Sequence, residues 1–541
     1  MTSDRVYFRQ DVVAEPLFNQ WYAWSYLISP ATAAMYMANS HLKIMRSFVA
    51  APQVHVAALK NPAMLGGPFI DYDAGRTAEI NALVNKTVEA QPHMLQLAEA
   101  IKTLDEMLQR EADGHSLEPL YQKVPEILKG YVELVYDLNN HASIRFIEGM
   151  LYRSPYYNTS AQSIALYVDG REERRFAFSS PRLAGEGQLH LDIPFNSPAL
   201  DELFRMKHTP QPLDYIKSLL GIEDEDAELF SSFFTSTPPA SHPQYRGDDI
   251  RVRYYGHACV LIETKELSIL CDPVISYEDE TGIERYTYAD LPDQIDYVLI
   301  THNHQDHCMF ETLLQLRHKI KNVIVPRSNS GMLVDPSLKL VLKAIGFASV
   351  FEIDEVEAIE IAGGSILGIP FLGEHGDLSI RSKIAYLVSI HGRSVLLAAD
   401  SNNIEPKLYD LIAEITGNID IVFLGMECDG APLSWLYGPL LTKPMSRKMD
   451  QSRRFDGSNC DKGLELLKRL SPAQVYVYAM GQEPWLTYLT SIKYTDQSRP
   501  IIESDRLGEH CRNQGVTTER LFGQKEIFMP ARRVDSTLAA C

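Results

Sequence analysis

The sequence predicts an α/β protein in two parts: a mixed α+β domain over residues 1–240 and a strand-rich α/β domain over residues 248–541. A chain of 541 residues is longer than one ordinary domain. Three prolines fall within residues 235–247, where they exclude a regular helix or a central strand. After this segment short strands alternate with helices, which is typical of α/β domains.

The first domain carries strong helical signals. Apolar residues recur at helical spacing over residues 76–112 and 117–138, and two β-rich runs within residues 162–180 predict a hairpin. Large aromatic side chains crowd residues 16–38. We expect these to form a core or a dimer interface; a wall of a substrate or partner surface is the alternative. This domain shows no catalytic cluster.

Composition limits the classes of partner. A hydrophobic content of 45% and a charged content of 23% are typical of globular proteins, and the net charge of -20 argues against nucleic acid or an anionic membrane as partner. No run of about 18 apolar residues predicts a membrane span, and the N-terminus lacks the apolar core of a signal peptide. The seven cysteines show no C-x-x-C pairing, so we expect free thiols and a cytoplasmic protein.

The most informative stretch is L-I-T-H-N-H-Q-D-H at residues 299–307, where potential metal ligands directly follow a buried strand. The spacing lets His302 and His304 converge on one point. Asp306 and His307 can converge on a second point close by. Imidazole and carboxylate together suit zinc, iron or manganese. The alternative is a polar loop with its histidines in solvent, but the density of ligands favours a site for two metals.

Other polar side chains follow the ends of other predicted strands. Asp272 ends one strand and is well placed to hold a ligand histidine from behind. Glu374 and His375 lie in a turn after another strand, Asp400 follows a buried apolar run, and Glu427 follows a third run in the same manner. Strand ends that present ligands to one edge are how α/β folds usually build a site.

Two further side chains near the motif have open roles. His257 could be a ligand, although a hydrogen bond within its strand turn is the stronger expectation. Cys308 follows the motif directly, and we expect a buried bystander rather than a ligand.

H-x-H-x-D-H after a strand, Asp-Pro at an earlier strand end and a lone aspartate after a later strand resemble the signature of the metallo-β-lactamase fold. The resemblance implies that residues 248–541 form an αββα sandwich, in which two β-sheets pack between helices. The motif says little about the reaction.

Longer runs resemble the diiron β-hydroxylases of the chloramphenicol-biosynthesis type, over nearly the whole chain. They are R-V-Y-F-R-Q-D-V-V (5–13), N-P-A-M-L-G-G-P-F-I-D-Y-D (61–73) and G-M-E-C-D-G-A-P-L-S-W-L-Y-G-P-L-L (425–441). This resemblance implies a monooxygenase with two iron ions, joined by an oxo or hydroxo bridge, and O2 as co-substrate. It would hydroxylate the β-carbon of an amino acid, aromatic by the same resemblance, held as a thioester on a carrier domain of a nonribosomal peptide synthetase.

The resemblance also implies roles for residues and domains. Each iron would take three ligands: His302, His304 and Glu374 for the first, and Asp306, His307 and Asp400, the last as a bridge, for the second. Glu427 would lie beside the cluster as a catalytic residue. Residues 1–240 would mediate dimerisation, active-site access and carrier docking, and an external donor would supply electrons.

The alternative function is a binuclear zinc or manganese hydrolase. Hydrolytic members of the fold usually place a ligand histidine where this chain has Glu374-His375, and another after a late strand. Here residues 475–478 are followed by A-M-G-Q, without histidine. Ligation by His375 instead of Glu374 would move the site towards the hydrolase pattern, whereas a carboxylate-rich set suits iron that reaches Fe(III). A non-catalytic scaffold is disfavoured because all six ligands are present.

Overall fold

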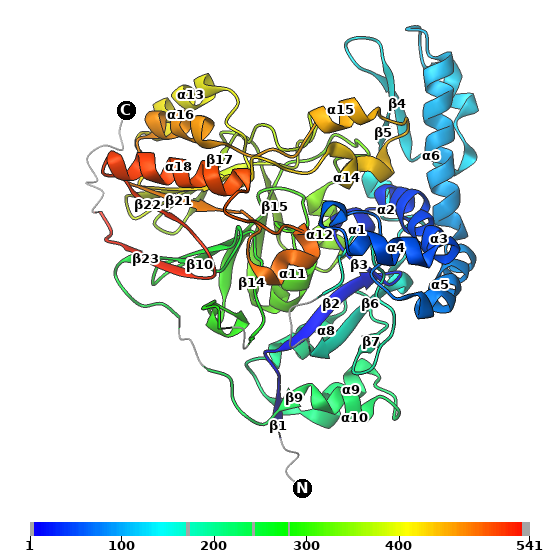
Figure 1. Cartoon of the computed structure of the whole chain (residues 1–541), viewed down its shortest axis with the longest axis horizontal. Coiled ribbons are helices and arrows are strands. Elements are labelled where there is room, and N and C mark those ends of the chain that lie inside the picture. The colour runs from blue at the N-terminus through cyan, green and yellow to red at the C-terminus, as the bar shows by residue number, and fades with distance from the viewer. Residues whose placement is uncertain (1–4, 169–173, 241–243, 280–281, 533–541) are drawn as a thin grey trace.

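Two seven-stranded sheets form the C-terminal part of the computed structural model, which describes residues 5–168, 174–240, 244–279 and 282–532; they lie in the left half of Figure 1. The first sheet has the order β15-β14-β13-β12-β11-β10-β23. Its strands are β10 (Ile250–Tyr254), β11 (Val260–Glu263), β12 (Ser268–Cys271), β13 (Ile295–Leu299), β14 (Ile320–Pro326), β15 (Val350–Ile353) and β23 (Lys525–Met529). The pairs from β12 to β15 are parallel and the others antiparallel.

The second sheet runs β16-β17-β18-β19-β20-β21-β22, with parallel pairs from β19 to β22. Its strands are β16 (Ala358–Ile361), β17 (Gly364–Ile369), β18 (Ala385–Ile390), β19 (Arg393–Leu397), β20 (Ile421–Gly425), β21 (Gln474–Tyr478) and β22 (Thr517–Arg520). Most of these strands are continuous apolar runs, as expected for strands that are buried on both faces.

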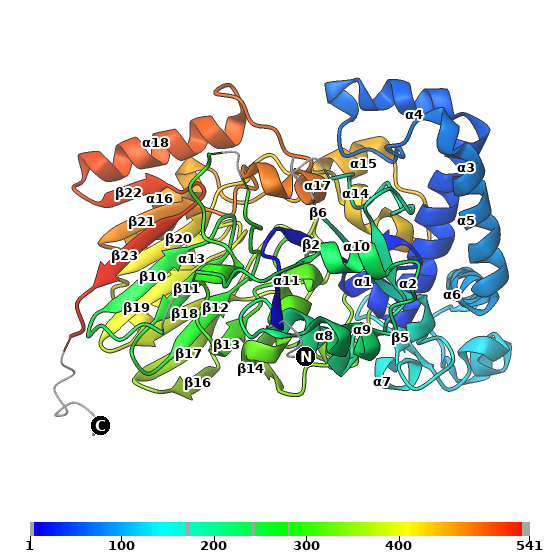
Figure 2. The same cartoon turned by 90° about the horizontal axis from the view of Figure 1, so that it is seen from below.

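Helices cover the outer faces of the paired sheets. Apolar residues of both sheets, such as Ile262 and Phe423, interlock between them. The helices α13 (Pro406–Thr416), α16 (Cys460–Leu470) and α18 (Arg499–Asn513) pack on the second sheet (Figure 2). On the other side, α11 (Phe310–Leu316) and α12 (Leu338–Ala344) share an apolar cluster with the first sheet. This is the αββα arrangement predicted from the sequence.

The N-terminal part is a mixed α+β assembly around the four-stranded sheet β3-β2-β6-β7. This sheet consists of β2 (Val12–Phe18), β3 (Trp21–Tyr22), β6 (Gln162–Val168) and β7 (Leu189–Leu191). A second sheet consists of β1 (Arg5–Phe8), β8 (Gln211–Pro212) and β9 (Phe234–Thr235). A third consists of β4 (Val132–Tyr136) and β5 (Ala142–Phe146). The helices are α1 (Ser25–Ile28), α2 (Pro30–Tyr36), α3 (Leu42–Ala50), α4 (Pro52–Leu59), α5 (Thr77–Ala90), α6 (Pro92–Glu111), α7 (Glu148–Leu151), α8 (Pro198–Arg205), α9 (Leu213–Leu220) and α10 (Ala227–Ser232).

The aromatic segment predicted over residues 16–38 is core. Trp21, Tyr26 and Tyr36 are buried, and the rings of Trp24 and Tyr26 stack at 4.5 Å. These side chains belong to one apolar cluster that continues through the outer face of the first sheet. The N-terminal part and the sandwich therefore pack on a shared core.

Two local predictions differ from the structure. The helix expected over residues 117–138 is wrong: this stretch holds two short 3₁₀ turns and then β4, because Pro119 and Pro125 interrupt any longer helix. The hairpin over 162–180 is also wrong, since β6 pairs with β2 and β7 and leaves no edge for a local partner. The turn expected at Asp169 and Gly170 lies outside the described residues. Residues 241–243 of the expected domain boundary lie outside them too.

One structural test bears on the membrane expectation. Among the described residues, none of the helices combines the length and the apolar character that a membrane crossing requires.

Candidate metal centre

The metal-binding motif lies where central strands of both sheets end. β13 ends at Leu299, and the parallel β12 ends one residue before Asp272, so both strands deliver polar groups to one edge. Asp400 and Glu427 follow β19 and β20 of the second sheet. Two further helices close this edge, α14 (Leu433–Tyr437) and α17 (Thr487–Thr490).

His302, His304 and Glu374 form a buried group whose ligand atoms all lie within 4.8 Å of one another. The Glu374 Oε1 atom is 3.1 Å from His304 Nδ1. His375 lies beside them, with its Nδ1 atom 2.8 Å from Glu374 Oε2, but it does not join this group. Between the two residues that the sequence left open, the geometry favours Glu374 as the ligand.

The remaining three candidates lie next to this group. His307 Nε2 is 3.1 Å from Asp400 Oδ2, and these two residues form a second group with His302. Asp306 and His307 belong to a third group, together with His257. Asp400 Oδ2 is also 3.8 Å from His302 Nε2, so Asp400 lies between the two sets of histidines, where a bridging ligand would lie.

Asp272 fixes the orientation of His307, as expected for a carboxylate at that strand end. Its carboxylate lies 2.8 Å from His307 Nδ1 and accepts a hydrogen bond from the Thr301 amide at 2.7 Å. His307 Nε2 is thereby turned towards Asp400. Burial raises the pKa of Asp272. Burial disfavours protonation of His307, but the Asp400 and Asp272 carboxylates outweigh this effect and raise its pKa.

The His257 ring contacts the Asp306 carboxylate and orients it. Its Nδ1 accepts a hydrogen bond from the Gly481 amide at 3.1 Å, so a neutral ring carries its proton on Nε2. That Nε2 lies 3.3 Å from Asp306 Oδ2. Gly481 belongs to the histidine-free loop after β21. In this chain the loop therefore contributes a backbone N–H that orients another residue, rather than a ligand.

Backbone strain is concentrated around the site. His257, Asp272, Glu374, Ala399 and Ala479 all have positive φ, between 41° and 67°. Non-glycine residues rarely adopt this region, and such positions cluster at functional sites because the surrounding structure must hold them there. Here they turn the chain sharply at the strand ends, so that neighbouring side chains face one another.

The donor atoms fit a pair of iron ions. His302 Nε2 and Asp400 Oδ1 are buried without a hydrogen-bond partner within the part of the chain that the structure describes. A buried polar atom without a partner is costly unless a cation or another group satisfies it. Three imidazoles and three carboxylates are a donor set that iron takes readily.

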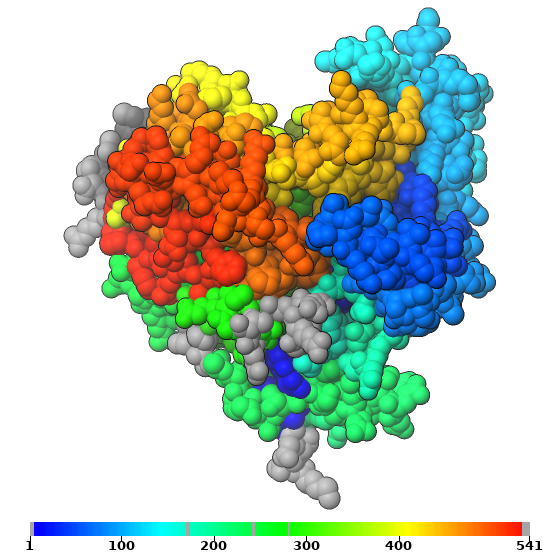
Figure 3. Space-filling view, in the orientation of Figure 1, coloured from blue at the N-terminus to red at the C-terminus, as the bar shows by residue number. Residues whose placement is uncertain are grey.

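A pocket of about 290 Å³ opens onto this cluster. Trp435 and Phe455 line it, as does Glu427, whose pKa is raised by burial and by the carboxylates around it. Leu65 and Gly66 of the N-terminal part also line it, and the Trp435 indole donates a hydrogen bond to the Gly66 carbonyl at 2.9 Å. The surfaces of these segments, gold, orange and blue, meet near the centre of Figure 3.

Sequence reasoning missed two neighbours of the motif. The Tyr437 hydroxyl lies 3.2 Å from His304 Nε2, and the Phe455 ring centre lies 5.7 Å from that of His304. Both residues are far from the motif in sequence, and nothing in their local pattern points to it. Cys308 is buried and joins none of the ligand groups, in agreement with its predicted bystander role.

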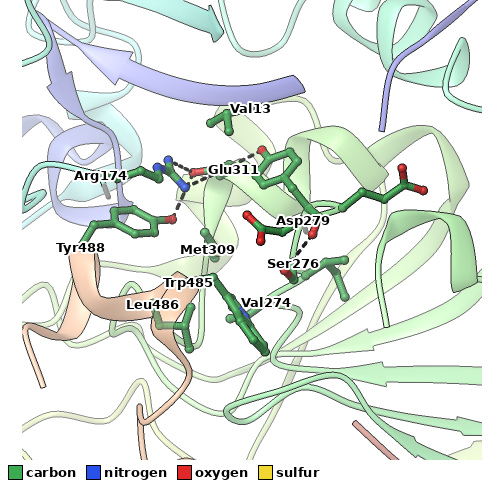
Figure 4. A pocket seen from close by; sticks show the side chains of 13 residues that line it. Val13, Arg174, Val274, Ser276, Asp279, Met309, Glu311, Trp485, Leu486 and Tyr488 are labelled. Carbon is green, nitrogen blue, oxygen red and sulfur yellow. Dashed lines mark hydrogen bonds and ion pairs between the residues drawn. The ribbon is translucent and has the colours of Figure 1, made fainter. Parts of the chain in front are cut away.

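A buried ion network lies behind the metal loop, and Figure 4 shows its pair Arg174 and Glu311. Glu311, at the start of α11, pairs with Arg174 of the N-terminal part at 2.7 Å. Arg174 also pairs with Glu15 of β2 at 2.5 Å, and Arg182 pairs with the same carboxylate at 2.7 Å. Burial opposes ionisation of Glu15, but the two arginines outweigh this effect and lower its pKa to about 2. The network ties the N-terminal part to the helix that follows the metal loop.

Comparison with known proteins decides the family. Residues 7–238 match the model of the diiron non-heme beta-hydroxylase N-terminal domain, and residues 251–427 match a beta-lactamase superfamily domain. Over 524 residues, 96% of this chain and 98% of the relative, the chain is 42% identical to the 4-amino-L-phenylalanyl-[CmlP-peptidyl-carrier-protein] 3-hydroxylase of Streptomyces venezuelae. The chain belongs to the diiron non-haem β-hydroxylase family.

The structural comparison agrees with this membership. The crystal structure of CmlA, a diiron beta-hydroxylase from Streptomyces venezuelae, matches with a TM-score of 0.91 and 40% identity over 98% of this chain and 100% of that one. A metal-dependent hydrolase of Bacillus velezensis is 26% identical over only 32% of this chain and 72% of its own length. The predicted fold class and enzyme class, a non-haem diiron hydroxylase, are therefore confirmed.

Proposed function

We propose that this β-hydroxylase acts on an amino acid, with an aromatic side chain, that is held as a thioester on a carrier domain of a nonribosomal peptide synthetase. The observation that carries the proposal is 42% identity over 96% of the chain to an enzyme named for a 4-amino-L-phenylalanyl group on a peptidyl carrier protein. The pocket supports it, because Trp435 and Phe455 offer aromatic faces beside the carboxylates.

We propose six ligands for two irons. His302, His304 and Glu374 would hold one ion, and Asp306, His307 and Asp400 would hold the other, with Asp400 as bridge. Two irons held there would supply O2 activation and oxidation of the β C–H bond, with electrons from an external donor. Asp272 and His257 keep His307 and Asp306 in orientation throughout. Glu427 has a raised pKa, so its carboxyl group can hold a proton at the pocket wall.

Tethering suits such a pocket. The carboxylate of a free amino acid is costly to bring into a buried site without a partner, and a thioester removes that charge. Contacts of the carrier remote from the reacting carbon can restrict the substrate to one pose. Residues 1–240 contribute to access, because Leu65 and Gly66 line the pocket. Dimerisation through these residues remains a prediction that sedimentation of the full chain would test.

The hydrolase alternative has little support from this site. Glu374, rather than His375, lies in the group of His302 and His304, and Gly481 follows β21 where hydrolases usually place a histidine. The match to the Bacillus velezensis hydrolase covers 32% of this chain, whereas the match to the carrier-protein hydroxylase covers 96%.

The test is turnover of a charged carrier domain. The diferrous enzyme is mixed with O2 and 4-amino-L-phenylalanyl carrier, and the carrier-bound product is weighed by mass spectrometry. We expect a gain of one oxygen atom with the thioester intact, and slow reaction of the free amino acid. Release of the amino acid without added oxygen would refute the proposal. As a control for the site, His304→Ala and Asp306→Ala should each abolish both the bound iron and turnover.

A further inference from the structure

A positively charged segment borders the metal pocket of this acidic chain. Residues 443–454 include the helix α15 (Arg447–Ser452) and carry five basic residues against one acidic residue, Asp450, although the net charge of the chain is -20. The basic residues are Lys443, Arg447, Lys448, Arg453 and Arg454. We call this segment the α15 surface.

The outer cations of the α15 surface face solvent. Arg447 and Lys448 are exposed, and neither forms an ion pair with another described residue. The single carboxylate, Asp450, is already used: it accepts hydrogen bonds from the Ser434 amide at 2.8 Å and the Ser434 hydroxyl at 2.7 Å. Met449 lies between these residues with 54% of its surface exposed. The surface therefore combines uncompensated positive charge with an apolar side chain.

The inner end of the same segment reaches the metal site. Arg453 donates a hydrogen bond to the Gly376 carbonyl at 2.7 Å, two residues beyond Glu374. Arg454 and Phe455 line the pocket itself. Any partner seated on the α15 surface would thus lie beside the entrance to the cluster (Figure 3, gold).

Exposed apolar residues lie across the same entrance. Leu65 lines the pocket with 40% of its surface exposed, and its neighbour Met64 is 43% exposed. Ile492 also lines the pocket, and its neighbour Lys493 is exposed. Elsewhere, the half-buried Arg469 sits beside an acid, Glu465, at 2.6 Å. The entrance therefore offers exposed apolar side chains and an exposed cation close to the α15 surface, where, among the described residues, Arg454 alone pairs with acids, Asp429 at 3.3 Å and Asp456 at 3.9 Å.

We propose that the α15 surface of the sandwich, rather than residues 1–240 as expected from the sequence, is the docking face for the carrier domain. The inference rests on the proposed function, which places an aminoacyl group in the pocket on a phosphopantetheine arm. The phosphodiester of that arm stays at the carrier end, outside the pocket, and it is an anion. Arg447 and Lys448 would pair with this phosphodiester and with acidic side chains around it, while Met449 would contact apolar carrier residues. Such rim charges chiefly steer association and fix orientation.

Charge reversal at the two exposed cations tests the proposal. The double variant Arg447→Glu/Lys448→Glu is compared with Lys86→Glu/Lys468→Glu, which makes the same change in net charge at exposed positions of α5 and α16. Three quantities are measured: the Kd for the uncharged holo-carrier by fluorescence anisotropy, kcat/KM for the 4-amino-L-phenylalanyl carrier, and turnover of the same amino acid as a pantetheine thioester, which lacks both carrier and phosphate.

We expect the α15 variant to lose about tenfold in Kd and in kcat/KM for the carrier substrate, most strongly at low salt. Turnover of the pantetheine thioester should stay unchanged, and so should all three quantities in the control variant. Arg447→Lys/Lys448→Arg, which keeps the charge, should bind the carrier normally.

Three results would count against the proposal, and each has a different meaning. Unchanged binding and turnover in the α15 variant, with a working unaltered enzyme, would overturn the docking face alone. An unaltered enzyme that fails to hydroxylate the carrier-bound amino acid would overturn the proposed function and the docking face with it. An equal loss in the Lys86→Glu/Lys468→Glu control would show a general effect of charge and would also overturn the docking face.

Discussion

Glu311→Gln should destabilise the contact between the N-terminal part and the metal-bearing sandwich. The Glu311 carboxylate is buried and accepts hydrogen bonds from Arg174 at 3.0 and 2.7 Å, Tyr22 at 2.9 Å, Tyr277 at 2.7 Å and Tyr488 at 3.2 Å. Glutamine keeps the shape of the side chain but removes the negative charge. Each Glu311 oxygen accepts at least two hydrogen bonds, so the glutamine NH2 group, which can only donate, would leave at least two donors without an acceptor.

The magnitude follows from the balance of buried charge. Arg174, Arg182, Glu15 and Glu311 sum to zero, and the substitution leaves one buried positive charge in excess. Removing one partner of a buried ion pair costs about 3–5 kcal/mol, because the remaining charge is left uncompensated. Replacing the charged pair by apolar residues of similar volume is far less costly, so Arg174→Met/Glu311→Leu should recover much of the loss.

Urea unfolding followed by tryptophan fluorescence measures the effect, since Trp21 and Trp24 are buried in the shared core. The control is Glu133→Gln, which breaks the exposed pair with Arg145, 2.6 Å long, and should cost less than about 1 kcal/mol. If Glu311→Gln unfolds at the same urea concentration as the control, the network does not hold the two parts together and the reasoning is wrong.

Three further outcomes are expected. Asp272→Asn should weaken iron binding about 10- to 100-fold, because His307 loses the carboxylate that orients it, and competition with a chelator would measure this; unchanged affinity would contradict the role. Glu374→Ala should reduce bound iron more than His375→Ala does, as metal analysis of the purified variants would show, and the reverse order would favour the hydrolase ligand set. Burial lowers the pKa of Lys207 from 10.5 to about 7, so the unfolded chain binds more protons than the folded one between these values. Lys207→Met should therefore raise the free energy of unfolding by about 1–3 kcal/mol at pH 7 and by less at pH 9. A stabilisation that increased with pH would show that the direction of the Lys207 pKa shift is wrong.

The sequence was most informative where chemistry and strand pattern coincide. The motif around His302 directly follows a buried strand, so its place at the sheet edge could be predicted. Asp272 could be predicted as the support of a ligand histidine for the same reason. Both inferences need only a short stretch of chain and the rule that strand ends meet at one edge.

Contacts between distant segments were beyond local reasoning. Glu311 and Arg174 lie 137 residues apart, and Tyr437 and His304 lie 133 apart. Hydrophobic periodicity says which side chains are buried, but it does not say which segments meet. The error over residues 117–138 has a different cause: apolar spacing indicated a helix, and Pro119 and Pro125 prevented it.

The shared core has a consequence for how enzymes of this family can diversify. Side chains on the outer face of the sandwich, such as Leu270, Val298 and Phe310, pack in the same cluster as the aromatic segment of the N-terminal part. Either part on its own would therefore expose apolar side chains at this boundary. Exchanging residues 1–240 between relatives would juxtapose two faces that were not shaped for each other, with overpacking in some places and cavities in others. New substrate preferences should arise through paired changes across the boundary rather than through transfer of a whole domain.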